Sequence, residues 1–137
     1  MYFAQSLNGF IAKETGAESF VSGPSWKRFV RAARSCQCLV VGRVTYDLLA
    51  PYRREFRGVK IIAVSGVLDK VVHTSNVKPD IISAVRFLQD SGYDKILIGG
   101  GSRLFADALK NDIVDEVWVD MMPTIIGTGI PAFYPQD

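Results

Sequence analysis

A glycine triplet in the second half of the chain has the composition of a phosphate-binding turn. The apolar run 96–98 leads into Gly99-Gly100-Gly101, and Ser102 and Arg103 follow directly. Glycine lets the backbone come close to a ligand, and free amide groups at the start of a helix attract an anion. The segment lacks the Gly-Lys-Ser/Thr ending of a P-loop and the spacing of a Rossmann fingerprint. A plain strand-to-helix turn is the competing interpretation.

A second glycine turn occurs earlier in the chain. Gly42-Arg43-Val44-Thr45 comes directly after the apolar run 38–41. An arginine can donate two hydrogen bonds to one phosphate, which would suit the 2′-phosphate that separates NADP from NAD. A surface arginine paired with a nearby acid such as Asp47 is the alternative. Two such turns in one chain favour a shared site for the phosphates of a dinucleotide more than either turn does alone.

Apolar runs and amphipathic stretches alternate along the whole chain. The helix that follows Ser22 has a capping side chain and a proline in its first turn. This alternation predicts a mostly parallel sheet with helices on both faces, in which ligands bind at the carboxyl ends of the strands. Both glycine turns follow such ends. We expect strands at 2–7, 38–41, 60–64, 71–74 (weaker), 95–98 and 114–119, helices after residue 22 and at 46–49, 80–89 and 102–110, and a closing loop at 123–131.

Composition excludes several other classes of protein. The 137 residues are 48% hydrophobic and 22% charged, which is typical of one globular domain. No apolar run is long enough to span a bilayer and the start does not resemble a signal peptide, so we expect a cytoplasmic protein with no membrane partner. A net charge of +2 is too small for a nucleic-acid-binding surface. Cys36 and Cys38 predict neither a disulfide framework nor a metal site.

Four segments together resemble the riboflavin-biosynthesis reductase domain (the RibD C-terminal domain) and its dihydrofolate-reductase-like relatives. Residues 6–12, Ser-Leu-Asn-Gly-Phe-Ile-Ala, resemble the Ser-Leu-Asp-Gly-x-Ile-Ala opening of that family. Residues 41–46 are similar to its Gly-Arg-x-Thr element, and 98–104 to its second phosphate turn. Residues 114–117, Val-Asp-Glu-Val, and the prolines, glycines and phenylalanine of 123–133 resemble its Val-Asp-Glu-Leu strand and Pro…Gly-x-Gly-x-x-Phe segment. The four segments occur in the family's order.

The resemblance implies an α/β, dihydrofolate-reductase-like fold with three αβα layers and a mostly parallel central sheet, in a single domain over residues 1–137. It implies an NADPH-dependent reductase, usually a homodimer, that passes a hydride to a small heterocyclic or imine substrate. In the riboflavin branch this substrate is a ribosylamino-pyrimidine phosphate, 5-amino-6-(5-phosphoribosylamino)uracil. A non-catalytic NADP(H)-binding or regulatory module of the same fold is the alternative.

Site residues follow from the resemblance by position. For Ser65 a plain turn residue is the alternative, and for Trp26 a plain core residue. We expect Tyr2, Trp26 and Leu49 on the substrate side, with Asn8 and Tyr46 as catalytic candidates. The implied NADPH-binding residues are Ala4, Ile11 and Ala12 beside the nicotinamide, Gly42, Arg43, Val44 and Thr45 at the diphosphate and adenosine side, Ser65 near the 2′-phosphate, and Ile98, Gly100, Gly101, Ser102, Arg103 and Leu104 at the other phosphate wall.

The sequence also departs from the family pattern. Asn8 stands where the family has an acid, and an amide can orient a substrate but cannot exchange a proton with it. The first helix begins Pro-Ser-Trp-Lys over residues 24–27, without the acid that dihydrofolate reductases place there, so we do not expect folate reduction. Relatives continue into further strands beyond the position of Asp137. Truncation of this domain and its completion by a partner are both open.

Overall fold

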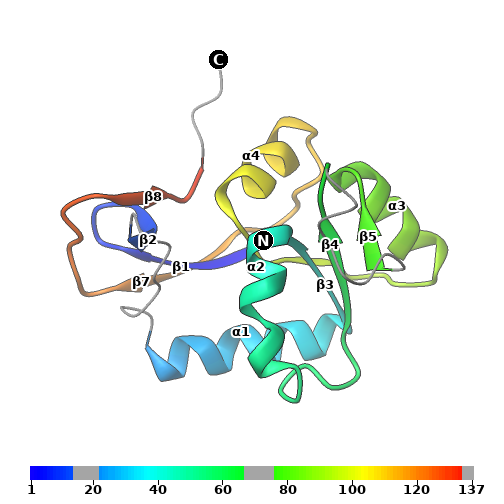
Figure 1. Cartoon of the computed structure of the whole chain (residues 1–137), viewed down its shortest axis with the longest axis horizontal. Coiled ribbons are helices and arrows are strands. Elements are labelled where there is room, and N and C mark those ends of the chain that lie inside the picture. Colours follow the sequence, from blue (N-terminus) through cyan, green and yellow to red (C-terminus); the bar gives the residue numbers. More distant parts are fainter. Residues whose placement is uncertain (14–21, 67–75, 134–137) are drawn as a thin grey trace.

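The computed structural model of the chain describes residues 1–13, 22–66 and 76–133 (Figure 1). It confirms the α/β fold with a parallel central sheet. The predicted strand at 71–74 lies outside the described residues. The elements are β1 (Tyr2–Ser6), β2 (Phe10–Lys13), α1 (Gly23–Cys36), β3 (Cys38–Gly42), α2 (Arg43–Leu48), a 3₁₀ turn (Ala50–Tyr52), β4 (Lys60–Val64), β5 (Val77–Lys78), α3 (Ile81–Asp90), β6 (Leu97–Ile98), α4 (Ser102–Lys110), β7 (Trp118–Met122) and β8 (Gly129–Pro131).

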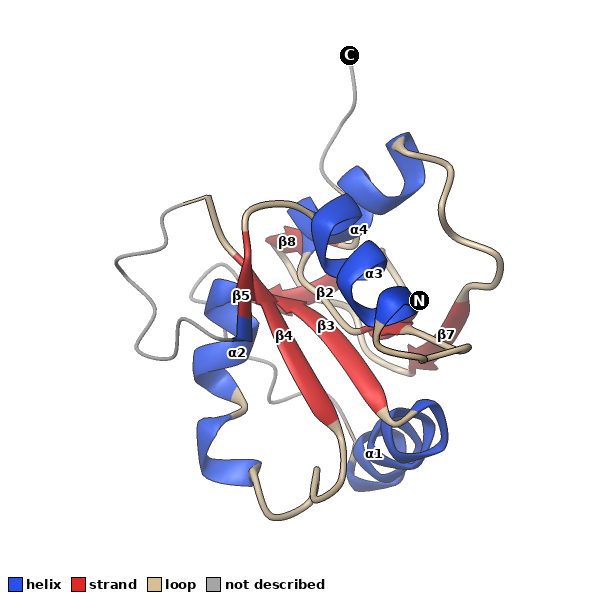
Figure 2. Ribbon diagram, turned by 90° about the vertical axis from the view of Figure 1, so that its right-hand side faces the viewer, coloured by secondary structure: helices blue, strands red, loops and turns tan. Residues whose placement is uncertain are grey.

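The central sheet has four parallel strands in the order β5-β4-β3-β6. Its centre is β3, whose residues 38–41 are completely buried, as the continuous apolar run predicts for a strand covered on both faces. Leu39 and Val41 pack with Ala33 of α1 and Tyr46 of α2. Cys38 and Val40 belong to the opposite cluster, which includes residues of α3 and α4. Figure 2 shows α2 on one side of β3 and β4, with α3 and α4 on the other.

The other strands form two further pairs. β1 pairs with β7 in parallel, and β2 pairs with β8 in antiparallel orientation. Figure 1 shows these four strands gathered on one side of the molecule, beside the central sheet. The pairing brings residues near the start of the chain next to residues near its end. Among the described helices, none is both long and apolar enough to cross a membrane.

Several predicted elements need correction. The strand expected at 114–119 is β7, which begins at Trp118 and ends at Met122. The closing segment is not only a loop, because it contains β8, and β2 was not predicted. Both are short and are held by pairing with each other, a contact that local sequence does not reveal. At Gly129 an added Cβ would collide with the carbonyl oxygen of Ala12, so this glycine permits close pairing and does not mark a turn.

The predicted helix at 80–89 is present as α3. Its apolar pattern indicates Ile82, Val85 and Leu88 as the inward face, and the structure confirms only Leu88 among them as a buried residue. Ile81, Ala84 and Leu88 are the buried residues, whereas Ile82 and Val85 are only partly buried. The small side chain of Ala84 lies against the sheet. Ile81 and Ile82 are equally apolar, so hydrophobicity alone does not decide which of the two faces inward.

Candidate functional site

The two glycine turns meet at the carboxyl ends of β3 and β6. These strands are neighbours in the central sheet, and the amide of Gly42 donates a hydrogen bond to the carbonyl oxygen of Gly100 over 2.7 Å. The amide of Gly99 donates to the carbonyl oxygen of Val40 over 2.9 Å. The prediction that the two turns lie side by side on one sheet is therefore confirmed.

The close approach depends on the absence of side chains. A Cβ added at Gly99 would lie 2.8 Å from Cδ1 of Leu39 and 2.9 Å from Cζ of Phe29. Gly100 has a φ of +127°, a backbone conformation that favours glycine. A Cβ added at Gly100 would lie 3.7 Å from Oγ1 of Thr45. The triplet thus leaves a narrow space between the turn and Thr45 that side chains would fill.

The start of α4 differs from the starts of α1 and α3. The Ser22 hydroxyl accepts a hydrogen bond from the backbone amide of Ser25 at the start of α1, and the Asp80 carboxylate accepts one from the amide of Ser83 at the start of α3. Gly101, which precedes α4, supplies no such cap. The first amides of a helix have no partner within the helix, and the start of α4 therefore favours an anionic ligand.

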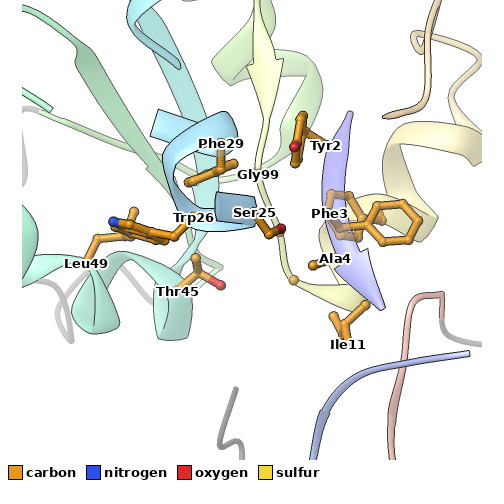
Figure 3. Close-up of a pocket in the computed structure, with 13 residues that line it drawn as sticks. Tyr2, Phe3, Ala4, Ile11, Ser25, Trp26, Phe29, Thr45, Leu49 and Gly99 are labelled. Carbon is orange, nitrogen blue, oxygen red and sulfur yellow. The ribbon is translucent and has the colours of Figure 1, made fainter. Parts of the chain in front are cut away.

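A pocket opens next to the paired turns (Figure 3). One wall is aromatic and comes from β1 and α1. Trp26 is held there by a hydrogen bond from its indole nitrogen to Oε2 of Glu55, 2.5 Å long. The glycine triplet and Thr45 also line the pocket. The lining residues are Tyr2, Phe3, Ala4, Ile11, Ser25, Trp26, Phe29, Thr45, Leu49, Gly99, Gly100, Gly101 and Phe105.

The pocket brings together eight of the residues predicted from the sequence. They are Tyr2, Trp26 and Leu49 of the substrate set, and Ala4, Ile11, Thr45, Gly100 and Gly101 of the cofactor set. The other predicted residues do not line it. They are Asn8, Ala12, Gly42, Arg43, Val44, Tyr46, Ser65, Ile98, Ser102, Arg103 and Leu104.

Some of the residues outside the pocket have clear structural roles. Ile98 and Leu104 are buried in the core, and the Ser102 hydroxyl donates a hydrogen bond to the carbonyl oxygen of Pro131. The backbone amide of Ser65 donates to the carbonyl oxygen of Lys78 over 2.9 Å, and its side chain is buried. These residues hold the elements around the pocket in place.

Arg43 and Val44 lie on the surface beside the turns. Nη1 of Arg43 is 3.5 Å from Oδ2 of Asp47, and both side chains are substantially exposed. This is the ion pair that the alternative interpretation of Arg43 expected. Exposed pairs of this kind are weak, about 0–1 kcal/mol, so the guanidinium could leave Asp47 for a phosphate at little cost. Val44 is exposed and carries no polar side chain.

Asn8 has a structural position that its prediction as a catalytic residue did not anticipate. Its Oδ1 accepts hydrogen bonds from the Ser6 hydroxyl, over 2.8 Å, and from the amide of Ile126, over 3.1 Å. Its Nδ2 donates to the carbonyl oxygen of Ile126 over 2.5 Å. The amide joins the turn between β1 and β2 to the segment before β8. The polar atoms of Asn8 are thus used within the fold, and its catalytic role stays a prediction.

Tyr46 is likewise a core residue. Its ring is buried against residues of the central sheet, and the Arg53 guanidinium lies 4.6 Å from the ring centroid. Its hydroxyl is buried without a hydrogen-bond partner among the described residues. Tyr46 does not line the pocket, and its catalytic role also stays a prediction.

Sequence reasoning missed Asp120 of β7. Its Oδ2 accepts hydrogen bonds from the Tyr2 hydroxyl over 2.6 Å, from the Ser25 hydroxyl over 2.7 Å and from Nε of Arg28 over 3.2 Å. Ser25 was also missed as a pocket residue. The parallel pairing of β7 with β1 places Asp120 opposite Ala4. A lone aspartate within an apolar strand, Trp-Val-Asp-Met-Met, was the available signal, since a buried acid needs partners.

The hydrogen bonds around Asp120 determine the protonation states of Asp120 and Tyr2. Burial raises the pKa of the Asp120 carboxyl, but the hydrogen bonds from Tyr2, Ser25 and Arg28 outweigh burial and hold that pKa below its ordinary value. Burial, followed by the hydrogen bond to Asp120, raises the pKa of Tyr2. At neutral pH Asp120 is therefore ionised and Tyr2 keeps its proton.

The fold and the pocket define an α/β protein of the dihydrofolate-reductase-like class. The chain belongs to the family of the RibD C-terminal domain, whose model matches residues 52–137. It is 29% identical to the protein YwjB of Bacillus subtilis (strain 168) over 98% of this chain and 81% of YwjB.

Two solved structures share the fold. A putative riboflavin biosynthesis protein from Shewanella sp. PV-4 matches with a TM-score of 0.77 at 24% identity, over 98% of this chain and 81% of that one. A diaminohydroxyphosphoribosylaminopyrimidine deaminase/5-amino-6-(5-phosphoribosylamino)uracil reductase from Thermotoga maritima matches with a TM-score of 0.74 at 18% identity. The match covers 99% of this chain and 48% of the Thermotoga protein. At these identities the two likenesses establish the fold.

Proposed function

We propose that this protein is an NADPH-dependent reductase that transfers a hydride to a small heterocyclic or imine substrate related to pyrimidines. The observation that carries the proposal is the hydrogen bond between Gly42 and Gly100, which sets two glycine turns side by side at the mouth of an aromatic pocket. Membership of the RibD C-terminal domain family and the reductase named among the fold relatives support it.

The residues present fit a dinucleotide. The space between the glycine triplet and Thr45 would be filled by side chains at Gly100 or Gly101. The start of α4, which Gly101 precedes without a side-chain cap, favours the negative charge of a phosphate. Arg43 would pair with a 2′-phosphate in exchange for its weak pair with Asp47. Ala4 and Ile11 present small and apolar surface to a flat ring in the pocket.

The cofactor, when bound, supplies the hydride. The chain itself supplies orientation and the exclusion of water: Trp26 and Phe29 give the pocket a rigid apolar wall, and holding two reactants in place can contribute several kcal/mol. Among the lining residues, none is a carboxylic acid, histidine or lysine. The proton that the reduced substrate needs would therefore come from water.

A non-catalytic NADP(H)-binding module is the second candidate. The observation that favours it is the same lack of an acid in the pocket, together with the structural use of Asn8. Both candidates require cofactor binding, and only the first requires turnover.

Two measurements test the proposal. Titration with NADPH, followed by energy transfer from Trp26 to the cofactor in a Trp118→Phe background, should give saturable binding that is tighter than for NADH. Oxidation of NADPH with aminopyrimidine and imine substrates should then separate an enzyme from a binding module. Absence of saturable NADPH binding by the folded chain would refute both candidates.

A further inference from the structure

Three donors converge on one oxygen behind the aromatic wall of the pocket. The Tyr2 hydroxyl, the Ser25 hydroxyl and Nε of Arg28 all donate to Oδ2 of Asp120. Tyr2 and Ser25 line the pocket, whereas Asp120 does not. Asp120 lines a second hollow together with Arg28 and Tyr2, so Tyr2 lies between the two spaces. Asp120 is thus placed to act on the pocket through the two hydroxyls.

The direction of these hydrogen bonds is fixed by chemistry. An ionised carboxylate can only accept hydrogen bonds, so each hydroxyl must donate its single proton to Asp120. The low pKa of Asp120 and the raised pKa of Tyr2 are consistent with this protonation. Toward the pocket, each hydroxyl oxygen can therefore only accept a hydrogen bond, through its lone pairs. The Arg28 guanidinium also interacts with the Tyr2 hydroxyl and occupies part of the acceptor capacity of that oxygen.

Ser25 shows the consequence most clearly. It is 2% exposed, and within the part of the chain that the structure describes its Oγ makes one side-chain hydrogen bond, to Asp120. Figure 3 shows the oxygen of Ser25 between the start of α1 and Ala4. A ligand group that enters here meets an oxygen that can accept a hydrogen bond but has no proton left to give.

We propose that Asp120 is a positioning residue that makes this wall of the pocket a hydrogen-bond acceptor. The site therefore selects a flat ring that presents an N–H donor, such as an amino or imino group, at this wall, and it discriminates against a ring with a carbonyl or ether oxygen there. This inference rests on the proposed function and narrows its substrate to amino- or imino-bearing heterocycles. When a buried acceptor on the protein faces an acceptor on the ligand, neither atom has a hydrogen-bond donor. The binding free energy lost in this way is far larger than that of a missing contact.

The test compares 4-aminopyrimidine with 4-methoxypyrimidine, two probes of similar size that differ in the donor. Dissociation constants are measured by ligand-observed NMR at about pH 7 with the wild-type chain, Asp120→Asn, and the control Asp107→Asn, an exposed acid on α4. The wild type and Asp107→Asn should bind the amino probe at least tenfold more tightly. In Asp120→Asn the new amide can donate, so a hydroxyl can turn its proton to the pocket, and the preference should disappear or reverse.

Two further variants keep the inference falsifiable if Asp120→Asn folds poorly. Ser25→Ala and Tyr2→Phe each remove one acceptor and should each reduce the preference, while Asp120→Asn in the double Ser25→Ala, Tyr2→Phe background should not change it further. A wild type without preference for the amino probe, or an Asp120→Asn variant that is folded and keeps the wild-type preference, would overturn the inference. NADPH titration of the same proteins tests the proposed function separately, because the side-chain hydrogen bonds of Asp120 join it to Tyr2, Ser25 and Arg28, whereas the cofactor phosphates are assigned to the glycine turns and Arg43.

Discussion

The amide of Gly42 and the carbonyl of Gly100 are joined by a hydrogen bond of 2.7 Å. This contact makes the positions of the two turns depend on each other, because each turn closes a strand of the same sheet and begins a helix. A change that moves either turn should therefore disturb both the local packing and the pocket. Substitutions at the triplet test this dependence.

Replacement of Gly99 by alanine should destabilise the protein and weaken NADPH binding. The new Cβ would lie 2.8 Å from Leu39 and 2.9 Å from Phe29, and such overpacking typically costs about 1–3 kcal/mol. We expect a melting temperature several degrees lower. Gly23→Ala is the matched control, because its Cβ would meet no atom within 4 Å, and it should leave both properties unchanged. Equal behaviour of the two variants would contradict the packing role of Gly99.

Replacement of Arg43 by alanine should weaken NADPH binding and leave NADH binding almost unchanged. A hydrogen bond to a charged group contributes about 1.5–3 kcal/mol, which corresponds to roughly 10- to 100-fold in affinity. Fluorescence titration with both cofactors measures the effect, and Arg86→Ala, at an exposed position of α3, is the control. An equal loss of affinity for both cofactors would show that Arg43 does not contact the 2′-phosphate.

The sequence was sufficient to predict the elements that carry strong local patterns. The strand at 60–64 and the helix at 102–110 have the predicted bounds, and the run at 38–41 is the buried centre of the sheet. The adjacency of the two glycine turns also followed, because parallel strands bring their carboxyl ends to one edge. The bounds of these elements depend on residues nearby in the chain, whereas the adjacency of the turns follows from a general rule of parallel sheets.

What could not be predicted depends on pairing between distant segments. β2 and β8 have little strand character of their own and exist because each supplies a partner for the other. The roles of Asn8 and Asp120 are set by Ile126 and by Tyr2, residues more than a hundred positions away. The residue type at position 8 suggested a catalytic role for Asn8, whereas its tertiary contacts give Asn8 a structural role.

The stability of the protein should depend on the ionisation of Asp120. Its pKa in the folded state lies below the ordinary value of 3.8, so its contribution to the free energy of unfolding is present above that value and is lost as the pH falls through the folded-state pKa. Urea unfolding of the wild type and Asp120→Asn from about pH 7 to about pH 3 measures the contribution. The wild type should be the more stable protein at neutral pH, and the difference should narrow in acid. A difference that does not change with pH would contradict the linkage.

Cys38 should react with thiol reagents only after unfolding. The residue is completely buried, its thiol donates to the carbonyl oxygen of Lys95 over 3.2 Å, and burial, with a smaller contribution from Cys36, raises its pKa from 9.0 to about 11. In a Cys36→Ser variant, labelling at about pH 8 should be absent until urea is added. Because the folded-state pKa is raised, the stability that the neutral thiol contributes should be complete below pH 9.0 and lost as the pH rises toward about 11. Rapid labelling of the folded variant would show that Cys38 is accessible.

Replacement of Asn8 by aspartate separates a structural role from a catalytic one. The substitution restores the acid of the family motif, but it replaces the Nδ2 donor by an oxygen that faces the carbonyl of Ile126 at the 2.5 Å contact. Repulsion between the two oxygens should favour the protonated acid, so the introduced carboxyl should have a raised pKa. Asn8→Asp should therefore be less stable than the wild type at about pH 7, and part of that loss should be recovered at about pH 4. Asn8→Ala should lose about 1–2 kcal/mol at both pH values, because it removes the hydrogen bonds without adding a charge. Urea unfolding measures the stabilities. A stable Asn8→Asp variant that oxidises NADPH faster than the wild type would instead place this side chain against the substrate.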